Sequence, residues 1–305
     1  MKMSEPTQFR TTALRGEMLR DESMSRHVSW RAGGVAQRVY QPADLADLQM
    51  FLQQTPADEP LLAVGLGSNL LVRDGGFRGT VLLFVGALAE LRMEGDLIYA
   101  QAGVAGAKLA RFAAANHLCG AEFFVGIPGT LGGMLAMNAG CYGGETWQKV
   151  QRVQVLTRSG KLLERTAQEY DIGYRHAALR KESDEFFVGA WLRFEQGSAD
   201  AARVAIKALM EKRSASQPLQ LPNCGSVFRN PPGDYAARLI ESCGLKGKRI
   251  GGAQVSEKHA NFIVNAGEAT ATDIEDLVNE VRATVLRQTG VELHTEVKIV
   301  GEYKS

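Results

Sequence analysis

The first third of the chain contains apolar runs whose spacing predicts a helix among short strands. Residues 44–54 place apolar side chains three to four positions apart, which forms a single stripe on a helix. The stripe consists of Leu45, Leu48, Phe51 and Leu52. Shorter apolar runs predict strands at 36–41, 61–64, 70–73 and 80–85. This order predicts a small βαββ unit, and residues 1 to about 25 are expected to be loosely ordered.

The middle of the chain predicts a second group of elements in which strands dominate. A strand is expected at 98–102, and the 3.6-residue period of the next apolar positions predicts a helix at 108–117. Residues 151–157 and 161–165 form a predicted hairpin around a glycine-containing turn. A further strand is expected at 186–194, so this group forms a second α/β unit.

The last third predicts a third unit that begins with a helix at 200–212, where the composition becomes more polar. Two short strands and a closing strand are expected at 251–255, 261–265 and 291–300. A long helix precedes the closing strand. Thr272 and Glu275 match a capping box at its start, and Gly290 ends it.

The length of 305 residues suits two or three compact units, and the composition changes near Gly197 and Ser198, where a further domain is expected to begin.

A stretch between Gly126 and Gly144, which reads GIPGTLGGMLAMNAGCYGG, stands out from this pattern because it is dense in glycine. Glycine weakens regular structure, so such a density is expected where the backbone closely approaches another group. Thr130 can cap a short helix whose first N–H groups would face outward and bind an anion such as a diphosphate. The alternative is tight helix packing, since Gly129 and Gly133 have the GxxxG spacing of apolar membrane spans. The sequence favours the ligand site, because nothing here is long enough for such a span.

A second glycine loop lies upstream, at 65–69, where the chain reads GLGSN. It is not a dinucleotide fingerprint, because Leu70 stands where the third glycine is needed and no helix follows. Successive N–H groups of such a loop can still bind an anion, with Ser68 and Asn69 as further donors, although an ordinary β-turn is the alternative. Two such loops in one chain favour one long dinucleotide that contacts both.

Charge and cysteine content narrow the classes of partner. The 35 basic and 34 acidic residues nearly cancel, which gives no overall electrostatic reason to expect nucleic acid or an anionic membrane surface as a partner. The 4 cysteines are far apart, and the 5 histidines lack metal-ligand spacing, so we expect reduced thiols and no metal. The N-terminal residues lack the apolar segment of an export signal. We therefore expect a cytoplasmic protein with no membrane anchor.

Three residues outside the glycine loops are candidates for chemistry, and each also has an ordinary structural interpretation. Arg175 can be a surface arginine, Ser226 can hydrogen-bond the backbone of its turn, and Glu296 can face solvent on a strand. Spacing alone does not join them into a catalytic set.

The order of several strings nevertheless resembles one family. The strings are AVGLGSNLLV, GAEFFVGIPGTLGGMLAMNAGCYGGE, YR, CGSVFRNP, KHANFIVN and LHTEVKIVGE. Together they resemble the UDP-N-acetylenolpyruvoylglucosamine reductase (MurB) family of peptidoglycan precursor synthesis, over nearly the whole chain after Ser25. The resemblance implies an α+β fold, with a two-lobed FAD-binding region of the vanillyl-alcohol-oxidase (PCMH) type and a separate α+β substrate domain. The lobes are expected at 1–90 and 91–199 and the substrate-binding domain at 200–296, and the closing strand at 297–305 can return to the first lobe. It also implies FAD as a non-covalent cofactor, NADPH as reductant and UDP-N-acetylglucosamine enolpyruvate as substrate, while protein partners stay open.

The resemblance also implies site residues. It assigns catalysis to Arg175, Ser226 and Glu296. FAD contacts are expected from the two glycine loops, at Gly65, Gly67, Ser68, Asn69, Leu70, Gly126, Ile127, Pro128, Gly129, Thr130, Gly132, Gly133, Asn138, Ala139 and Gly140. Candidates for holding the substrate are Tyr174, Arg229, Asn230, Lys258, His259 and Asn261. The chain departs from the family at Ala177, where relatives often have a serine that supports the arginine, and it lacks the extra tyrosine loop of longer members.

The three residue types suit the implied reaction. Reducing the enolpyruvyl double bond builds negative charge beside the carboxylate, and a guanidinium together with a protonated carboxyl group can offset this charge. A hydroxyl can then supply the proton that the carbon needs. Two alternatives are a flavin oxidase on the same scaffold and a nucleotide-binding regulatory protein. The glycine loops contain no histidine that could tether a flavin, which favours dissociable FAD.

Overall fold

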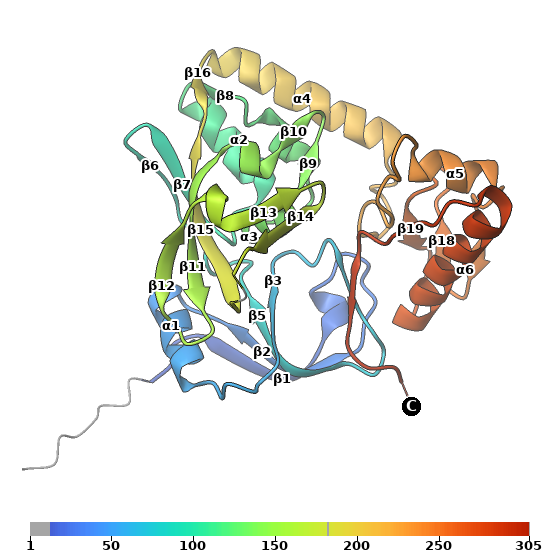
Figure 1. Ribbon diagram of the computed structural model, residues 1–305, viewed down its shortest axis with the longest axis horizontal. Coiled ribbons are helices and arrows are strands. Elements are labelled where there is room, and N and C mark those ends of the chain that lie inside the picture. Colours follow the sequence, from blue (N-terminus) through green and yellow to red (C-terminus); the bar gives the residue numbers. More distant parts are fainter. Residues whose placement is uncertain (1–12, 182, 305) are drawn as a thin grey trace, which may run out of the picture.

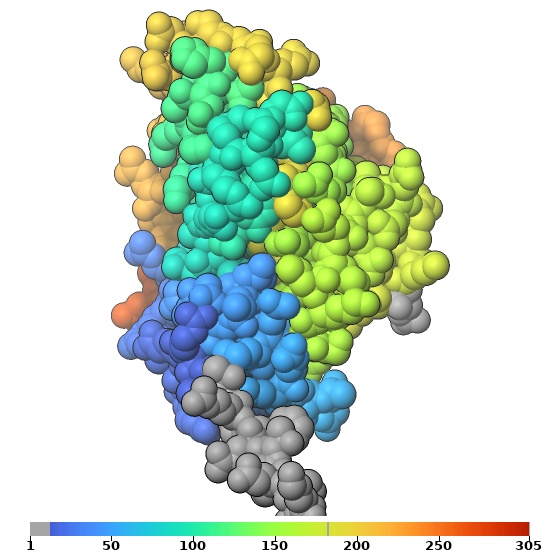
Figure 2. Space-filling view, turned by 90° about the vertical axis from the view of Figure 1, so that its left-hand side faces the viewer, coloured from blue at the N-terminus to red at the C-terminus, as the bar shows by residue number. Residues whose placement is uncertain are grey.

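The computed structural model describes residues 13–181 and 183–304. Figure 1 shows a sheet built from the N-terminal residues, a larger sheet above it and a third group of helices and small strands at one side. A long helix, α4 (Ala199–Ser216), runs along the top from the second group to the third. The space-filling view shows the N-terminal segment, in blue, packed directly beneath the cyan and green segments of the larger sheet (Figure 2).

The N-terminal sheet is largely parallel and has an antiparallel strand at its edge. Its order is β1-β2-β5-β3, formed by β1 (Glu17–Ser23), β2 (Val35–Gln41), β5 (Phe77–Leu83) and β3 (Leu61–Val64). Helix α1 (Leu45–Gln54) buries Leu48, Phe51 and Leu52 of the predicted stripe. The predicted strands and helix of this unit are confirmed.

The prediction of loose order before residue 25 was wrong over Glu17–Ser23, which form β1. Within residues 13–181 and 183–304, this strand lies at the sheet edge and pairs with β2 alone. Most of its side chains are exposed, and four of its seven residues are charged. When both faces of a strand are polar, apolar and polar residues do not alternate along it, so the sequence pattern does not reveal the strand. Residues 1–12 lie outside the described residues.

The second sheet is antiparallel, with the order β12-β11-β15-β7-β6. Its strands are β12 (Leu162–Arg165), β11 (Val150–Thr157), β15 (Glu185–Arg193), β7 (Leu97–Gln101) and β6 (Leu91–Glu94). Helices α2 (Gly106–Ala115) and α3 (Leu131–Ala136) contribute buried residues to the core around this sheet. The hairpin over 151–165 and the strands near 98–102 and 186–194 are confirmed, whereas β6 was not predicted.

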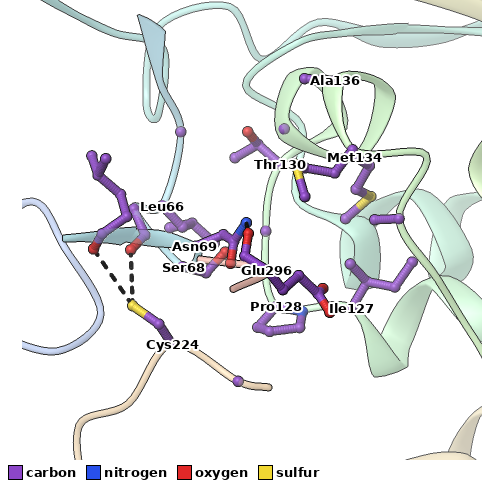
Figure 3. Close-up of a pocket in the computed structure, with 18 of the residues that line it drawn as sticks. Leu66, Ser68, Asn69, Ile127, Pro128, Thr130, Met134, Ala136, Cys224 and Glu296 are labelled. Atoms are coloured by element: carbon purple, nitrogen blue, oxygen red, sulfur yellow. Dashed lines mark hydrogen bonds between the residues drawn. The ribbon is translucent and has the colours of Figure 1, made fainter. Parts of the chain in front are cut away.

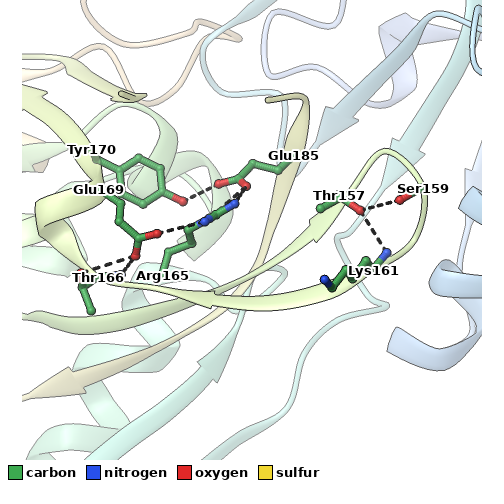
Figure 4. A network of polar contacts seen from close by, with 8 residues as sticks. All are labelled: Thr157, Ser159, Lys161, Arg165, Thr166, Glu169, Tyr170 and Glu185. Carbon is green, nitrogen blue, oxygen red and sulfur yellow. Dashed lines mark hydrogen bonds and ion pairs between the residues drawn. The ribbon is translucent and has the colours of Figure 1, made fainter. Parts of the chain in front are cut away.

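A small hairpin beside this sheet carries one of the candidate residues at its turn. Strands β13 (Tyr170–Gly173) and β14 (His176–Leu179) pair across Tyr174 and Arg175. A polar network anchors the start of the hairpin (Figure 4): the Tyr170 hydroxyl donates to Glu185 at 2.6 Å, and Arg165 binds both Glu169 and Glu185. Burial and this contact raise the pKa of Tyr170, so its hydroxyl stays a donor at physiological pH.

The third unit packs helices against a small antiparallel sheet. It contains α5 (Ala236–Ser242), α6 (Ala271–Thr289), β17 (Arg249–Ile250), β18 (Ala253–Val255) and β19 (Ile263–Asn265). Its core also includes Trp30 and Leu71 from the N-terminal part of the chain. The division into three units at 90 and 199 therefore stays a prediction, since one hydrophobic core crosses it.

Helix α6 begins earlier than predicted. The capping box is formed by Thr270 and Asp273, not by Thr272 and Glu275. Thr272 and Glu275 instead contact Asp74 and Arg73, which follow β4 (Leu70–Val72). Both pairs fit the S/T-x-x-acid pattern, and only the contacts across units distinguish them.

The closing strand is shorter than predicted. Only β20 (Lys298–Val300) is a strand, and it pairs in parallel with β4 of the first unit. The residues before it bond instead to the loop after Cys224, as Glu296 N donates to Val227 O. Minor pairs complete the structure at β8 (Leu118–Cys119), β16 (Glu195–Gln196), β9 (Gly140–Cys141) and β10 (Gly144–Glu145). None of the helices described is both long and apolar enough to span a membrane.

Candidate active site

A cavity of about 320 Å³ lies where the three units meet. Both glycine loops line it, together with Arg175, Ser226 and Glu296. Its size falls within the range of small-molecule and cofactor sites. Figure 3 shows Ser68 and Asn69 on one side, Pro128 and Thr130 on the other, and Glu296 between them. Gly65 and Glu296, which are 231 positions apart in sequence, thus share one cavity.

The two glycine loops contact each other. A Cβ added at Gly65 would come within 2.1 Å of Thr130 Oγ1, and one added at Gly129 would lie 3.3 Å from Ser68 Oγ. Thr130 is 2% exposed, and its hydroxyl does not cap α3. The absence of a side chain at Gly65 therefore lets the loops approach.

The first N–H groups of α3 do not form the anion site that the sequence suggested. Leu131 N donates to Val104 O at 2.8 Å, and Gly132 N donates to Ala102 O at 2.9 Å. These bonds to the loop after β7 satisfy the amides that the helix itself leaves unpaired. The expectation was wrong for these two amides, because sequence does not show which carbonyl groups lie nearby.

Neighbouring glycines of α3 face opposite ways. A Cβ at Gly132 would lie 3.0 Å from Ala102 Cβ, whereas a Cβ at Gly133 would meet nothing within 4 Å. Gly133 lines the cavity. The open space above it, in a wall of glycine and small side chains, is large enough for a flat cofactor to approach the backbone.

Arg175 and Glu296 form an ion pair in the cavity. Arg175 Nε donates to Glu296 Oε1 at 2.9 Å, and Arg175 Nη2 donates to Gly140 O at 3.0 Å. The side chains are 19% and 16% exposed, so the pair is largely removed from solvent. Burial raises the pKa of Glu296, and the charges of Arg175 and Arg229 offset only part of this effect.

The backbone of Arg175 is strained. Its φ is +54°, in the left-handed region that costs a non-glycine residue about 1 kcal/mol or more. The contacts to Glu296 and Gly140 hold the side chain across the turn. The support of Arg175 therefore does not depend on position 177, where relatives often have serine and this chain has Ala177.

Ser226 lies on a loop that backbone bonds connect to the Glu296 segment. Gly225 precedes it with φ +73°, which reverses the chain. Val227 N then donates to Asn261 O at 2.9 Å, and Val227 O accepts from Glu296 N at 2.8 Å. A hydroxyl, a carboxyl group and a guanidinium are thus brought to one cavity by three segments of the chain.

Comparison with known proteins decides the family. A model described as the C-terminal domain of UDP-N-acetylenolpyruvoylglucosamine reductase matches residues 217–300, and an FAD-binding domain model matches residues 36–166. Reductases of this name from Thiobacillus denitrificans and Nitrosomonas eutropha are 58% and 54% identical, covering 95% and 96% of this chain and 94% and 92% of theirs. The crystal structure of the MurB protein from Thermus caldophilus matches with TM-score 0.79 and 29% identity, over 93% of this chain and 98% of the other. The chain belongs to the UDP-N-acetylenolpyruvoylglucosamine reductase family.

This reductase is therefore an FAD-dependent oxidoreductase of peptidoglycan precursor synthesis, as the sequence predicted. The fold class is confirmed as well, with a two-lobed FAD-binding region and a further C-terminal domain. The residues present fit FAD, because both glycine loops line the cavity and the space over Gly133 is open among the described residues. Individual FAD contacts stay predictions.

The structure separates the predicted FAD residues into two groups. Most of them line the cavity, but Gly132 and Asn138 do not. Asn138 is 2% exposed, its amide donates to Glu145 and to Gly173 O, and its Oδ1 accepts from Trp147 N. These contacts give Asn138 a structural role beneath the loop.

The predicted substrate residues are also divided. Lys258 lines a groove that adjoins the cavity. Tyr174 does not line the cavity; it is 47% exposed, and its ring lies 5.0 Å from the guanidinium carbon of Arg175. Asn261 is buried and bonds the Phe228 backbone, and Asn230 accepts from Ala236 N at the start of α5. Both ends of the Asn261 amide are therefore used in the structure, whereas Asn230 is exposed and uses only its oxygen. Arg229 and His259 each contain a buried nitrogen, Nε and Nδ1, without a hydrogen-bond partner among the described residues.

Several residues that line the cavity were missed by the sequence analysis. They are Met134, Met137, Cys141, Gln217, Cys224, Phe262 and Lys298. Lys298 could have been found, because it stands two positions after Glu296 in an alternating segment and therefore points the same way. Met134, Met137, Cys141 and Phe262 lie next to predicted residues, and neither they nor Gln217 and Cys224 carry a distinguishing pattern.

Proposed function

We propose that this reductase binds UDP-N-acetylglucosamine enolpyruvate with its enolpyruvyl group between Arg175, Ser226 and Glu296, and that it uses NADPH as reductant in the cytoplasm. The observation that supports this most directly is the single cavity that contains the Arg175–Glu296 pair, Ser226 and both glycine loops. A substrate carboxylate needs a cation to bind it, and reduction of an enol ether needs a proton donor. The cavity provides both, with Arg175 as the cation and Ser226 as the proton donor.

Each of the three residues has a chemical task in this proposal. FAD bound against the glycine loops supplies the electron pair for reduction. Arg175 retains donors beyond those used by Glu296 and Gly140, and these can bind the substrate carboxylate. Burial raises the pKa of Glu296, so its carboxyl group holds a proton up to a higher pH than an exposed glutamate does, and in that form it can donate to the carboxylate oxygen on which charge develops. Ser226 then gives its hydroxyl proton to the adjacent carbon.

A groove that adjoins the cavity is suited to the nucleotide part of the substrate. It has a volume of about 510 Å³ and shares Gln217 with the cavity. Lys258 lines it and donates from Nζ to Ser214 O at 2.7 Å, so its ammonium is held at the end of α4. Arg213 lies one residue before Ser214 and donates to Gln217 Oε1 and to Val125 O. Burial lowers the pKa of its guanidinium. We infer that Lys258 stabilises the diphosphate, whereas Arg213 lines neither the groove nor the cavity and holds Gln217, which lines both.

Anaerobic titration tests this function. NADPH is expected to bleach the flavin absorbance of the purified holoenzyme, and UDP-N-acetylglucosamine enolpyruvate is expected to restore it stoichiometrically. Restoration by oxygen but not by the enolpyruvyl nucleotide would support an oxidase instead. Bound adenine nucleotide without flavin absorbance would contradict both enzymes.

A further inference from the structure

Two side chains attach the catalytic segments to the first glycine loop. The Cys224 thiol lies 3.6 Å from both Gly67 O and Leu70 O, where it can donate to either carbonyl group. Figure 3 shows the sulfur pointing from the Ser226 loop toward two backbone oxygens of the glycine loop. Asn69 Nδ2 donates to Glu296 O at 3.0 Å, and Asn69 O accepts from Lys298 N at 3.0 Å. Both tethers therefore start at the same loop.

The Cys224 thiol is a hydrogen-bond donor here and not a nucleophile. Cys224 is 3% exposed, and burial raises its pKa to about 12. The thiol is thus protonated at physiological pH, and only thiolates react readily. Its contribution is the contact that it makes.

Both tethers lie very close to the residues that they hold. A single residue, Gly225, separates Cys224 from Ser226, and a Cβ at Gly225 would meet nothing within 4 Å. Within the loop, Gly225 N donates to Asn223 Oδ1 at 3.0 Å, but the space beside Gly225 is open among the described residues. The position of Ser226 therefore also depends on the segments on either side. Asn69 bonds the carbonyl group of Glu296 itself.

We propose that Cys224 and Asn69 are positioning residues that hold Ser226 and Glu296 in register with the first glycine loop. This inference rests on the proposed roles of Ser226 and Glu296. Displacements near 1 Å in a reacting geometry can cost about 100-fold in rate. The tethers therefore act on the reaction with the enolpyruvyl substrate more than on reduction by NADPH, which needs neither the serine nor the glutamate.

Cys224→Ala tests the first tether, with Cys224→Ser as the conservative variant. Cys243→Ala is the matched control, because Cys243 is half-buried against the core of the third unit at the end of α5. The holoenzymes are compared at wild-type FAD content. We expect Cys224→Ala to slow the reaction of the reduced enzyme with the enolpyruvyl nucleotide by about 10- to 100-fold, while the rate of flavin reduction by NADPH stays unchanged. Cys224→Ser, which keeps a donor, is expected to recover much of the loss.

Hydrogen–deuterium exchange of the same holoenzymes gives a readout that does not depend on activity. Residues 225–228 should exchange faster in Cys224→Ala than in the wild type or in Cys243→Ala. Asn69→Asp, which removes the donor at constant size, should do the same for residues 293–298. Asn116→Asp is its control, because the Asn116 amide bonds Phe112 O on α2, away from the cavity.

Unchanged exchange and unchanged rates in Cys224→Ala and Asn69→Asp would overturn the proposal. Equal slowing of both half-reactions, with a lowered melting temperature, would also overturn it, since that is what a general loss of stability produces. Ser226→Ala and Glu296→Gln are measured in parallel. If those two react like the wild type while the tether variants exchange faster, the proposed function fails and the tethers stand as structural contacts alone.

Discussion

At the scale of single residues, the cavity contains two features that destabilise the folded protein but can serve catalysis. Arg175 has a left-handed backbone, and Glu296 is a carboxyl group buried with an arginine. Neither feature is expected from folding alone, because each raises the free energy of the native state. Such sites are where function is usually found.

Substitution at the ion pair should affect one half of the reaction. Arg175→Lys and Glu296→Gln are expected to slow the reaction of the reduced enzyme with the enolpyruvyl nucleotide by about 10²- to 10³-fold, because each removes a group that offsets developing charge. Reduction by NADPH should change far less. Stopped-flow absorbance measures both rates, and equal slowing would show that the pair only shapes the cavity.

Substitution of Ser226 distinguishes a catalytic role of its hydroxyl group from a structural one. Ser226→Ala keeps a small side chain in the turn, so folding, FAD content and reduction by NADPH are expected to persist. The reaction with the enolpyruvyl nucleotide should slow by roughly 10²- to 10⁴-fold if the hydroxyl supplies the proton. A lost turn hydrogen bond would instead cost about 1 kcal/mol of stability and leave the rate near the wild-type value.

The raised pKa of Glu296 predicts a pH-dependent stability difference. The native state holds this proton at pH values where the unfolded chain has lost it, so the wild type loses stability as pH rises from about 4 through the raised native pKa. Glu296→Gln lacks this titration. The two proteins should melt at similar temperatures near pH 4, and the variant should gain relative to the wild type as pH rises. A difference that is independent of pH would contradict this.

At the scale of elements, α3 presents a structural face and a ligand face through adjacent glycines. Gly133→Val is expected to leave thermal unfolding almost unchanged and to weaken FAD binding at least tenfold, because the added side chain fills the open space over the cavity. Gly132→Val should do the reverse, since its Cβ would press on Ala102 and overpacking costs about 1–3 kcal/mol. Melting curves and FAD titration of the apoprotein distinguish them.

Gly129 of the 126–144 stretch and Gly67 of the 65–69 loop give a further contrast. Gly129→Val should also yield folded protein without flavin colour, because its only close neighbour is the Ser68 hydroxyl. Gly67 is different: its φ is +59°, and a Cβ there would lie 2.2 Å from His27 O. A valine at Gly67 would therefore disturb the backbone itself, so loss of colour in that variant is no test of FAD contact.

At the scale of the whole molecule, a polar joint holds the third unit against the first. Arg73 binds Glu275 of α6 through two bonds of 2.8 Å, and the Tyr303 ring lies 4.3 Å from its guanidinium carbon. Asp74 accepts from Ala271 N and Thr272 N at the start of α6. Burial alone would raise the pKa of Asp74, but the bonds from Thr272 and Ala271 keep it below its ordinary value.

Removing the buried Arg73–Glu275 ion pair should destabilise the protein more than removing an exposed pair. Glu275→Gln is expected to lower the free energy of unfolding by about 1–3 kcal/mol, because it leaves a largely buried guanidinium without its charge partner. Arg78→Ala is the control. Its pair with Glu302 is 80% and 48% exposed, and exposed pairs contribute about 1 kcal/mol or less. Urea denaturation measures both, and equal effects would contradict the argument.

The sequence by itself determined the family, the α+β fold, the cofactor and the position of most helices and strands. These follow from local signals: the apolar period sets the element, and unusual density of glycine marks where a backbone approaches a ligand. Arg175, Ser226 and Glu296 were found by resemblance, since spacing alone left each with an ordinary alternative. Edge strand β1 and the true cap of α6 were missed because their signals are weak or duplicated nearby.

Only the tertiary structure decided which of these residues act together. The two loops contact through Gly65 and Thr130, and Glu296 is protected from solvent by segments far away in sequence. Tertiary contacts also assigned Asn138 and Asn261 to structure and gave Cys224 a partner. The physical reason is that burial, pKa and the direction of a hydrogen bond depend on neighbours in space, and a chain of 305 residues does not show its spatial neighbours in its order.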